Sequence, residues 1–369
     1  MAIIITGADG FIGRNLRVRL RESGRDGEMV LVTRSTTPQE LAAALREATF
    51  VFHLAGVNRP REASEFTEGN VGLTAALCAG LRAAGNRAPI IYASSTQAAL
   101  DNPYGRSKRA AEEVLQQHAR EGGGPVSIYR LPGVFGKWCR PNYNSVVATF
   151  CHNIARGLPI QIADPAAALR LVYVDDVVAA FTQRMQDVQP GAHFCEVEPV
   201  YATTVGELAE AIRSFHQCRD TLLIDAVGTG FKHALYATYV SYLPTEAFDY
   251  GVAAHGDARG VFVEMLKTRD SGQFSYFTAH PGITRGRHYH HSKTEKFLVI
   301  RGRARFAFRH ILTDETFELH TAGDEPRIVE TVPGWAHDIT NVGEDELIVM
   351  IWANENFDPQ RPDTYPHRV

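Results

Sequence analysis

The residues best suited to chemistry lie in the last quarter of the chain, where two short segments carry histidines. His288 and His290 are two positions apart, so on a strand their side chains would share one face. Glu295 begins an apolar strand pattern whose alternation predicts that its carboxylate points inward. A second segment, Pro333-Gly334-Trp335-Ala336-His337, adds a third imidazole. Three imidazoles and one carboxylate predict a divalent metal site, with Zn²⁺ favoured and Fe, Mn, Ni or Cu as alternatives.

A tyrosine and a lysine in the first third of the chain form a second candidate group. The segment Tyr104-Gly105-Arg106-Ser107-Lys108 opens a predicted helix, which puts Tyr104 and Lys108 one turn apart on the same face. A nearby ammonium favours phenolate, so Tyr104 would exchange a proton with a carbonyl or an alcohol near neutral pH. The preceding strand ends in Ser94-Ser95, whose hydroxyls are able to hydrogen-bond the reacting oxygen. The spacing alone is common, but in this context it predicts carbonyl–alcohol chemistry.

The amino-terminal segment has the pattern of a nucleotide-binding turn. A short apolar run leads into Thr6-Gly7-Ala8-Asp9-Gly10-Phe11-Ile12-Gly13 and then into a helical pattern. The three glycines allow a tight turn and let backbone N–H groups reach a pyrophosphate at the helix amino terminus. Where an NAD enzyme places an acid, the chain has Thr33-Arg34-Ser35-Thr36. Arg34 can pair with a 2′-phosphate, which favours NADPH; the alternatives are a plain strand-to-helix turn and a solvated arginine.

Two patterns of secondary structure are expected to position these groups. Up to about residue 245, short apolar runs alternate with helical patterns, which is typical of a parallel sheet with crossover helices. The predicted fold class of residues 1–246 is therefore an α/β Rossmann fold. Its predicted strands and helices are Ala2–Thr6, Phe11–Glu22, Val30–Thr33, Pro38–Glu47, Phe50–Leu54, Val71–Ala84, Ile90–Ala93 and Ser107–Arg120.

Beyond Asp249 the helical period disappears, and strand-like runs are separated by Gly, Pro, Asp and Asn. This pattern predicts an antiparallel barrel or jelly roll. Pro, Gly and polar residues interrupt both patterns between Leu243 and His255, so the second domain is predicted to span residues 247–369. The predicted strands are Gly260–Lys267, Gln273–Thr278, Lys296–Ile300, Ala304–Phe308 and Glu346–Trp352.

Composition narrows the classes of function. A chain of 369 residues with 44% apolar and 22% charged residues is typical of two soluble globular domains. A net charge of −4 gives no reason to expect nucleic acid or an anionic membrane as a partner. The five cysteines are scattered, which predicts reduced thiols. Because no signal-peptide pattern or membrane-length apolar run is found, the sequence predicts a cytoplasmic protein.

Together, the motifs of residues 1–245 resemble the extended short-chain dehydrogenase/reductase family. They are the glycine turn, His53-Leu54-Ala55-Gly56, Asn70-Val71-Gly72, the Ser94-Ser95 strand end, Tyr104 with Lys108, Leu131-Pro132-Gly133-Val134-Phe135-Gly136, and Tyr173-Val174-Asp175-Asp176-Val177. The resemblance implies that Tyr104 is the acid/base and that Lys108 lowers its pKa and holds the nicotinamide ribose. It also implies that Ser95 contacts the substrate oxygen, with Thr96 as the alternative. The implied cofactor-binding residues are Thr6, Gly7, Gly10, Phe11, Ile12, Gly13, Arg34, Leu54, Ala55, Gly56, Tyr104, Lys108, Leu131 and Gly133.

The chain departs from that family's epimerases and dehydratases at one place. The loop between Ser95 and Tyr104 is much shorter than usual, which reduces the lid over the substrate. The Asp-Glu pair that 4,6-dehydratases carry after their catalytic threonine is missing, which argues against dehydration.

The histidine segments resemble both motifs of the cupin family, with one residue fewer between Pro333 and Gly334. This resemblance implies an all-β jelly-roll barrel whose metal is held by four residues, and His291 is interpreted as a neighbour that supports a ligand. The four implied metal ligands are His288, His290, Glu295 and His337. Barrel-type sugar epimerases use His and Tyr for proton transfer without a metal, so histidines acting as bases remain an alternative.

A reductase joined to a cupin resembles, nearly end to end, the CapF/WbjC-type capsular polysaccharide enzymes, with Lys137–Asn144 and Pro281–Gly286 among the similar segments. That resemblance implies a UDP-2-acetamido-2,6-dideoxy-4-hexulose substrate. The cupin would invert C3, and the reductase would reduce the C4 ketone with NADPH. The implied product is UDP-2-acetamido-2,6-dideoxy-β-L-talose, a precursor of UDP-N-acetyl-L-fucosamine for capsule or O-antigen.

The predicted assembly is a homodimer, which is the usual state of both folds. Two other functions stay open. One is a 4-ketosugar reductase whose cupin only binds metal or mediates oligomerisation. The other is a non-catalytic NADP sensor, although such a protein is expected to lack the Tyr or the Lys, and both are present.

Overall fold

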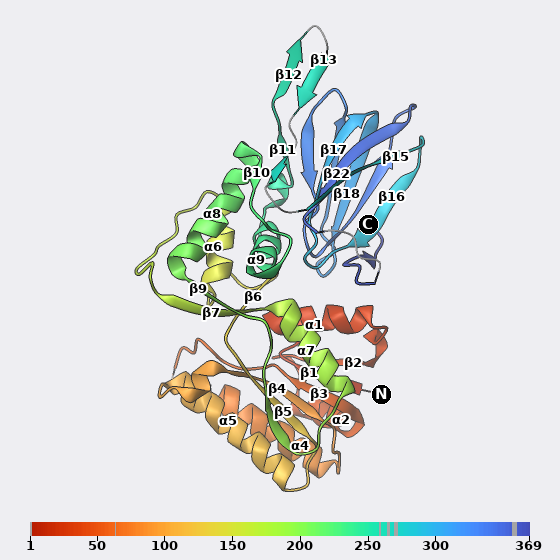
Figure 1. Cartoon of the computed structure of the whole chain (residues 1–369). Helices are drawn as coiled ribbons and strands as arrows, with labels where there is room; N and C mark the ends of the chain where they lie inside the picture. Colours follow the sequence, from red (N-terminus) through yellow and green to blue (C-terminus); the bar gives the residue numbers. More distant parts are fainter. Residues whose placement is uncertain (1, 63, 258–259, 264–265, 269–271, 356–359) are drawn as a thin grey trace. The chain divides into compact units, whose positions relative to one another are not determined.

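The amino-terminal part of the computed structural model is built on a six-stranded parallel sheet with strand order β2-β1-β3-β4-β5-β8 (Figure 1). The structure describes residues 2–62, 64–257, 260–263, 266–268, 272–355 and 360–369. Parallel neighbours need crossover connections, and helices supply them, which confirms the predicted Rossmann-type fold. The strands are β1 (Ala2–Thr6), β2 (Met29–Val32), β3 (Ala48–His53), β4 (Ile90–Ser95), β5 (Val126–Leu131) and β8 (Ala192–Cys195). The helices are α1 (Phe11–Glu22), α2 (Pro38–Glu47), α3 (Ser64–Phe66), α4 (Leu73–Ala83), α5 (Pro103–Arg120) and α7 (Val174–Gln186).

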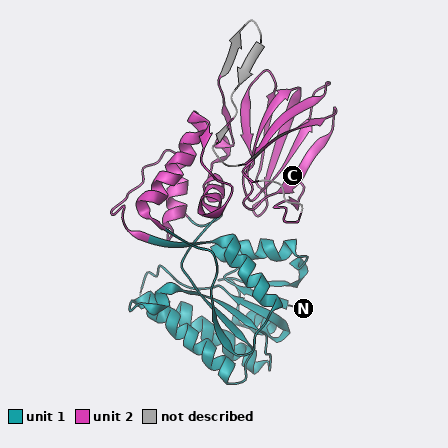
Figure 2. Cartoon of the chain, in the orientation of Figure 1, with its two compact units in different colours: residues 1–140, 169–202 teal, residues 141–168, 203–369 magenta. Residues whose placement is uncertain are grey.

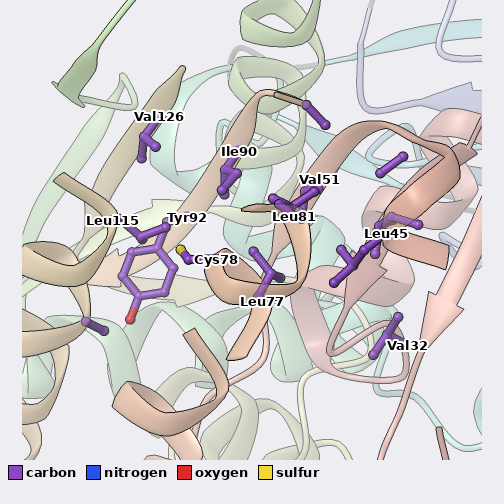
Figure 3. Close-up of a cluster of buried hydrophobic side chains, with 14 of the residues drawn as sticks. Val32, Leu45, Val51, Leu77, Cys78, Leu81, Ile90, Tyr92, Leu115 and Val126 are labelled. Atoms are coloured by element: carbon purple, nitrogen blue, oxygen red, sulfur yellow. The ribbon is translucent and has the colours of Figure 1, made fainter. Parts of the chain in front are cut away.

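The core of this part lies between the sheet and its helices (Figure 3). Every residue of β1 is buried, as expected for a central parallel strand with both faces covered. Val51 and Ile90 from neighbouring strands pack in one cluster with Leu77 of α4 and Leu115 of α5. The carboxyl ends of these strands therefore meet at one rigid edge of the sheet.

Two helices near that edge start differently from the prediction. The helix expected from Val71 is preceded by a π-helical turn, Thr67–Gly72, and α4 proper begins at Leu73. Helix α5 begins at Pro103 because Asn102 caps it, accepting a hydrogen bond from the Gly105 N–H at 2.8 Å. The cap puts Tyr104 in the first turn of α5.

The carboxyl-terminal part consists of two five-stranded antiparallel sheets, with orders β11-β20-β17-β22-β15 and β19-β18-β21-β16-β23. This arrangement confirms the predicted all-β cupin barrel. The predicted strand at 260–267 falls partly outside the described residues. The strands are β11 (Asp249–Gly251), β15 (Gln273–Ala279), β16 (Thr284–Tyr289), β17 (Glu295–Arg301), β18 (Arg303–His310), β19 (Thr316–Ala322), β20 (Arg327–Glu330), β21 (Trp335–Asn341), β22 (Leu347–Ala353) and β23 (Tyr365–Pro366).

The remaining elements lie between these two parts in the sequence or form short pairs. One three-stranded sheet has the order β6-β7-β9. No helix among the described residues is long and apolar enough to cross a membrane. The elements are β6 (Gly133–Phe135), α6 (Val146–Ile154), β7 (Ala168–Tyr173), β9 (Val200–Thr204), α8 (Val205–Thr221), β10 (Leu223–Ile224), α9 (Gly230–Val240), β12 (Ala254–Asp257), β13 (Gly260–Val263) and β14 (Lys267–Thr268).

Contacts divide the chain into two compact units (Figure 2). The first comprises residues 1–140 and 169–202, and the second comprises residues 141–168 and 203–369. Helices α6, α8 and α9 therefore belong to the same compact unit as the barrel. The predicted domain boundary at 246/247 marks the place where the sequence pattern changes from alternating strands and helices to strands alone. The compact units are defined by contacts instead, so this boundary stays a prediction.

Candidate active site and candidate metal centre

The glycine turn joins β1 to α1 with backbone hydrogen bonds. The Gly7 N–H donates to the Val32 carbonyl at 3.0 Å, and the Gly10 N–H donates to the Gly7 carbonyl at 2.9 Å. Gly7 has a φ of +68°, and a Cβ there would lie 2.7 Å from the Ala55 nitrogen. A Cβ on Gly13 would lie 2.3 Å from the Gly7 carbonyl oxygen. The turn thus has no room for a side chain at Gly7 or Gly13, and the amino end of α1 has no side-chain cap.

Other predicted cofactor residues lie at the same edge of the sheet. The Thr6 hydroxyl accepts a hydrogen bond from the Ala55 N–H at 3.2 Å, and the Thr6 carbonyl accepts one from the Leu54 N–H at 3.2 Å. Leu131 is the register partner of Ser95 in the neighbouring strand. The structure therefore groups the ends of β1, β3, β4 and β5 where a dinucleotide would bind in this fold.

The end of β2 carries a hollow that bears on the choice of cofactor. Thr33, Ser35, Thr36 and Glu40 are among its lining residues. Arg34 is exposed beside it in the chain. The Glu40 carboxylate accepts a hydrogen bond from the Thr37 N–H at 2.7 Å in a helix capping box. The hydrogen bonds from Thr37 lower the pKa of this carboxyl, so Glu40 is an anion committed to the amino end of α2.

Ser95 and Tyr104 come together at the end of β4. A hydrogen bond from Ser95 lowers the pKa of the Tyr104 phenol, but burial has the larger effect and raises it. The expectation that Lys108 lowers the pKa of Tyr104 stays a prediction, and desolvation of the phenol is the largest effect on this pKa. A tyrosine that stays protonated is suited to donating a proton. Thr96, the alternative to Ser95, is exposed in a 3₁₀ turn.

Lys108 is buried one turn after Tyr104 on α5. Its ammonium donates a hydrogen bond to the Ala93 carbonyl at 2.7 Å and lies 4.4 Å from the centre of the Tyr92 ring. Burial lowers the pKa of Lys108 to about 7, although Glu112 opposes the shift. A Cβ on Gly56 would lie 3.6 Å from the Lys108 nitrogen. Lys108 thus lies close to Gly56, which is one of the predicted cofactor-binding residues.

A buried polar chain, to which the sequence analysis gave no role, supports this edge. His53 bridges the Thr6 and Thr74 hydroxyls at 2.8 Å each, and Thr74 donates to the Asn70 carbonyl at 2.6 Å. Asn70 in turn donates to the Ser107 hydroxyl at 2.9 Å on α5. Burial lowers the pKa of His53 to about 3, so this imidazole is neutral. Asn70 and His53 stand in motifs quoted above, and only the folded structure shows that they connect β1 to the helix of Tyr104.

A second buried group behind the active residues was also missed. Glu112, on α5 like Tyr104, accepts a hydrogen bond from the Ser94 hydroxyl and forms an ion pair with Arg130 at 2.6 Å. The carboxylate is 2% exposed. Through Ser94 and Arg130, this glutamate connects α5, which carries Tyr104, to β4 and β5. A glutamate within a helical pattern gives no sequence signal for such a role.

In the barrel, strands β16, β17 and β21 bring together His288, Glu295 and His337, and they are joined by His290, the residue directly after β16. One donor atom from each lies within 4.8 Å of all the others. The Glu295 carboxylate lies 3.2 Å from His290 Nε2 and 3.6 Å from His337 Nε2. Neutral imidazoles and a carboxylate around one point are a suitable ligand set for Zn²⁺. Residues that the sequence places as far as 49 positions apart thus converge as predicted for a metal site.

A Zn²⁺ site needs neutral imidazoles and an ionised carboxylate. The pKa shifts of this cluster favour these states at His288 and Glu295 but not at His290. Burial, together with His337 and His290, lowers the pKa of His288 to about 3, so His288 is neutral. Burial alone would raise the pKa of Glu295, but His290, His337 and Lys293 hold it well below its usual range. The carboxylate in turn outweighs burial at His290 and raises that pKa. A metal that binds here therefore competes with a proton for His290.

Two residues outside the predicted set contact the cluster. The Lys293 ammonium lies 2.9 Å from the Glu295 carboxylate, and the backbone carbonyl of Asp363 is hydrogen-bonded to His290 Nδ1. His291, interpreted above as a supporting neighbour, donates its backbone N–H to the Asp363 carboxylate at 2.9 Å. Asp363 lies far from both cupin segments in the sequence, so no spacing rule would have found it.

The fold and these two groups define a dinucleotide-type oxidoreductase domain joined to a barrel that carries a candidate metal site. Residues 3–196 match the NAD dependent epimerase/dehydratase family, and residues 255–365 match a polysaccharide biosynthesis C-terminal domain. The chain belongs to the NAD dependent epimerase/dehydratase family, among its CapF/WbjC-type members that carry this second domain.

Individual relatives agree with this assignment. The chain is 57% identical over 365 residues to a UDP-2-acetamido-2,6-beta-L-arabino-hexul-4-ose reductase of Pseudomonas aeruginosa, covering 99% of this chain and 98% of the relative. It is 42% identical to the capsular polysaccharide assembling protein CapF of Staphylococcus aureus, with a TM-score of 0.67 and full coverage of both chains. A structure of MoeE5 in complex with UDP-glucose and NAD is 26% identical, with a TM-score of 0.51, over 57% of this chain and 80% of that one.

Proposed function

We propose that the chain is a bifunctional enzyme of nucleotide-sugar biosynthesis that acts on UDP-2-acetamido-2,6-dideoxy-4-hexulose. The barrel inverts C3, and the Rossmann domain reduces the C4 ketone with NADPH to give UDP-2-acetamido-2,6-dideoxy-β-L-talose. The product lies on the route to UDP-N-acetyl-L-fucosamine for capsule or O-antigen. The observation that carries the proposal is that one chain, 57% identical to a reductase of such a sugar, holds both the Ser95–Tyr104–Lys108 group and the histidine–glutamate cluster.

The reduction uses Ser95, Tyr104 and Lys108. NADPH, when bound, supplies the hydride that enters C4. Burial keeps Tyr104 protonated, so its phenol donates a proton to the C4 oxygen as the ketone becomes an alcohol. Ser95 hydrogen-bonds the same oxygen and orients it. Lys108 holds the nicotinamide ribose from its buried place beneath the end of β4.

The epimerisation uses the barrel cluster. His288, His290, Glu295 and His337 would hold a divalent metal, most favourably Zn²⁺, and its positive charge would stabilise an enolate formed when the C3 proton leaves. Returning a proton to the opposite face inverts C3. This step comes first, because reduction removes the ketone that makes the C3 proton acidic.

The preference for NADPH rests on the end of β2. Three hydroxyl residues and Arg34 stand where a carboxylate would bind the ribose of NAD. The Arg34 guanidinium pairs with the 2′-phosphate, and Glu40 is turned to the amino end of α2 by its capping contacts. The enzyme works in the cytoplasm as a homodimer, which is the usual assembly of both folds.

The proposal is tested with the UDP-4-ketosugar in deuterated water. NADPH oxidation reports reduction, and NMR reports both deuterium at C3 and the configuration of the product. A Tyr104→Phe/Lys108→Met variant is expected to lose NADPH oxidation and to keep C3 exchange. If this variant keeps its fold and fails to exchange the C3 proton, the barrel is not the epimerase. Absence of turnover with every candidate 4-ketosugar overturns the whole assignment.

A second candidate is a 4-ketosugar reductase whose barrel only binds metal or mediates oligomerisation. It is favoured by the name of the Pseudomonas aeruginosa relative, which describes a reductase and no epimerase. Under this function a His337→Ala variant would keep C3 exchange at the wild-type rate. Under the proposed function the same variant loses C3 exchange.

A further inference from the structure

The carboxyl-terminal segment 363–367 lies along the strand that carries the first metal-site histidine. Strand β23 pairs antiparallel with β16, so that Pro366 faces His288 and Tyr365 faces Tyr289. The His367 N–H donates to the Arg287 carbonyl at 2.9 Å. The Tyr365 ring stacks on Tyr289, with ring centres 5.5 Å apart. The segment is therefore part of the sheet that presents His288.

Asp363, at the start of this segment, binds the turn that connects β16 to β17. Its carboxylate accepts backbone hydrogen bonds from His291 at 2.9 Å, from Ser292 at 2.7 Å and from Lys293 at 2.7 Å. The Ser292 hydroxyl adds a contact at 3.1 Å. Consecutive N–H groups that converge on one carboxylate fix the path of the backbone. The fixed turn is the one that runs from His290 to Glu295.

The backbone carbonyl of Asp363 contacts His290 directly. It is hydrogen-bonded to Nδ1 of a ring that is fully buried. A carbonyl oxygen accepts only, so Nδ1 carries a proton, and Nε2 is the ring atom left to bind a metal. Nε2 is the atom that faces the Glu295 carboxylate at 3.2 Å. Metal-binding histidines commonly donate their other N–H to such a partner, which fixes ring orientation.

We propose that Asp363 is a positioning residue of the metal centre: its carboxylate shapes the His291–Lys293 turn, and its carbonyl orients the His290 ring. The carboxyl-terminal segment is thus a third element of the site, besides the two histidine segments. This inference rests on the proposal that the cluster binds a divalent metal. Asp363 acts through His290 and does not itself contact the ion.

The first experiment uses the wild-type full chain loaded with zinc and labelled with ¹⁵N-histidine. Two-bond ¹H–¹⁵N spectra distinguish the two ring nitrogens. The expected result is a His290 ring with its proton on Nδ1, in slow exchange with water. A His290 ring protonated on Nε2, or an Nδ1 proton that exchanges as fast as in a solvent-exposed histidine, overturns the inference without any mutation.

The second experiment compares Asp363→Asn with Asp324→Asn, whose side chain is exposed on the same barrel. In Asp363→Asn, an amide NH₂ group replaces one carboxylate oxygen and faces backbone N–H groups that need an acceptor. The turn and the His290 ring therefore lose their fixed positions. Zinc affinity, measured by competition with a chromophoric chelator, is expected to fall about 10- to 100-fold for Asp363→Asn and to stay unchanged for Asp324→Asn. The visible spectrum of the cobalt-loaded protein is expected to change only for Asp363→Asn, because it reports ligand geometry.

The outcomes separate this inference from the proposed function. A wild-type protein that binds no zinc removes the metal site itself, and the inference with it. A wild-type protein that binds zinc, together with a folded Asp363→Asn protein of equal affinity and identical cobalt spectrum, overturns the role of Asp363 alone. Ser292→Ala, which removes one of the four donors, is expected to give a smaller loss in the same direction. A Ser292→Ala protein with a larger loss than Asp363→Asn contradicts the inference.

Discussion

Two adjacent hydroxyl residues at the end of β4 have different surroundings. Ser95 is half-buried and hydrogen-bonded to Tyr104, whereas Thr96 is exposed. Both were candidates for the contact to the substrate oxygen. A half-buried hydroxyl beside the phenol costs less to orient during reaction than an exposed one, so its surroundings favour Ser95.

We therefore expect Ser95→Ala to lower the kcat of NADPH oxidation by about 10²- to 10³-fold, as for loss of one aligned hydrogen-bond donor. Thr96→Ala is the matched control and should stay within about twofold, since an exposed hydroxyl contributes little. Steady-state kinetics with the 4-ketosugar measures both. Equal losses in the two variants would show that the hydroxyls share the contact.

At the residue scale, a proton on His290 would compete with zinc at the proposed metal site. Glu295 raises the pKa of His290 above its usual value, while His288, with a pKa of about 3, holds no proton near neutrality. Below the pKa of His290, each unit of falling pH should weaken apparent zinc affinity about tenfold, and above it the affinity should level off. Chelator competition from pH 6 to pH 9, with calorimetry in two buffers, measures the slope and the protons released. A slope of two or more protons would contradict the neutral state of His288.

At the scale of elements, the β1–α1 turn shows how close backbone approach creates a binding site. At the glycines of this turn, the backbone packs closely against other backbone atoms. Gly10 and Gly13 approach the Gly7 carbonyl, and Gly7 approaches Ala55, which follows β3. The buried chain from Thr6 through His53 to Asn70 extends this contact to α5. The cofactor turn and the helix of Tyr104 are thus positioned by one connected set of hydrogen bonds.

Gly13→Ala is expected to weaken NADPH binding by at least about tenfold, because backbone atoms that sit 2.3 Å from the new Cβ force α1 to shift. Gly27→Ala provides the control, since a Cβ there meets nothing within 4 Å. Fluorescence titration with NADPH measures the two dissociation constants. Unchanged binding in Gly13→Ala would mean that α1 does not carry the pyrophosphate site.

At the scale of the whole molecule, the barrel and part of the helical region form one compact unit. Within it, Glu330 of β20 is paired with both Lys296 of β17 and Arg219 of α8. Arg219 also stacks on Tyr250, with its guanidinium carbon 4.2 Å from the ring centre, and Lys296 donates to the Tyr250 hydroxyl at 3.0 Å. Charges this deeply buried are tolerated because each has a partner.

Glu330→Gln should therefore destabilise this unit by about 3–5 kcal/mol, since it leaves Lys296 and Arg219 buried without a carboxylate. Glu344→Gln, at an exposed position, is the control and should change stability by less than about 0.5 kcal/mol. Urea unfolding followed by fluorescence of the barrel tryptophans measures both. A loss below about 1 kcal/mol for Glu330→Gln would show that solvent or a rearranged partner satisfies the two cations.

Sequence alone was sufficient wherever a function depends on neighbours in the chain. The glycine turn, the spacing of Tyr104 and Lys108, and the pair His288 and His290 follow from local periodicity, and both fold classes followed from the alternation of strands and helices. The predicted start of helix α5 was less accurate. The helix begins at Pro103, because the Asn102 cap decides where it starts. Helix ends depend on such single hydrogen bonds and not on the apolar pattern.

The tertiary structure alone decided the contacts between residues distant in sequence. Only the fold brings the Asp363 carbonyl to His290, joins Glu112 to Ser94 and Arg130, and groups α8 with the barrel through Glu330. It also decided that burial, more than the hydrogen bond from Ser95, sets the direction in which the pKa of Tyr104 is shifted. The physical reason is common to all of these. Desolvation and long-range pairing depend on what covers a side chain, and the covering residues come from elements that no local pattern connects.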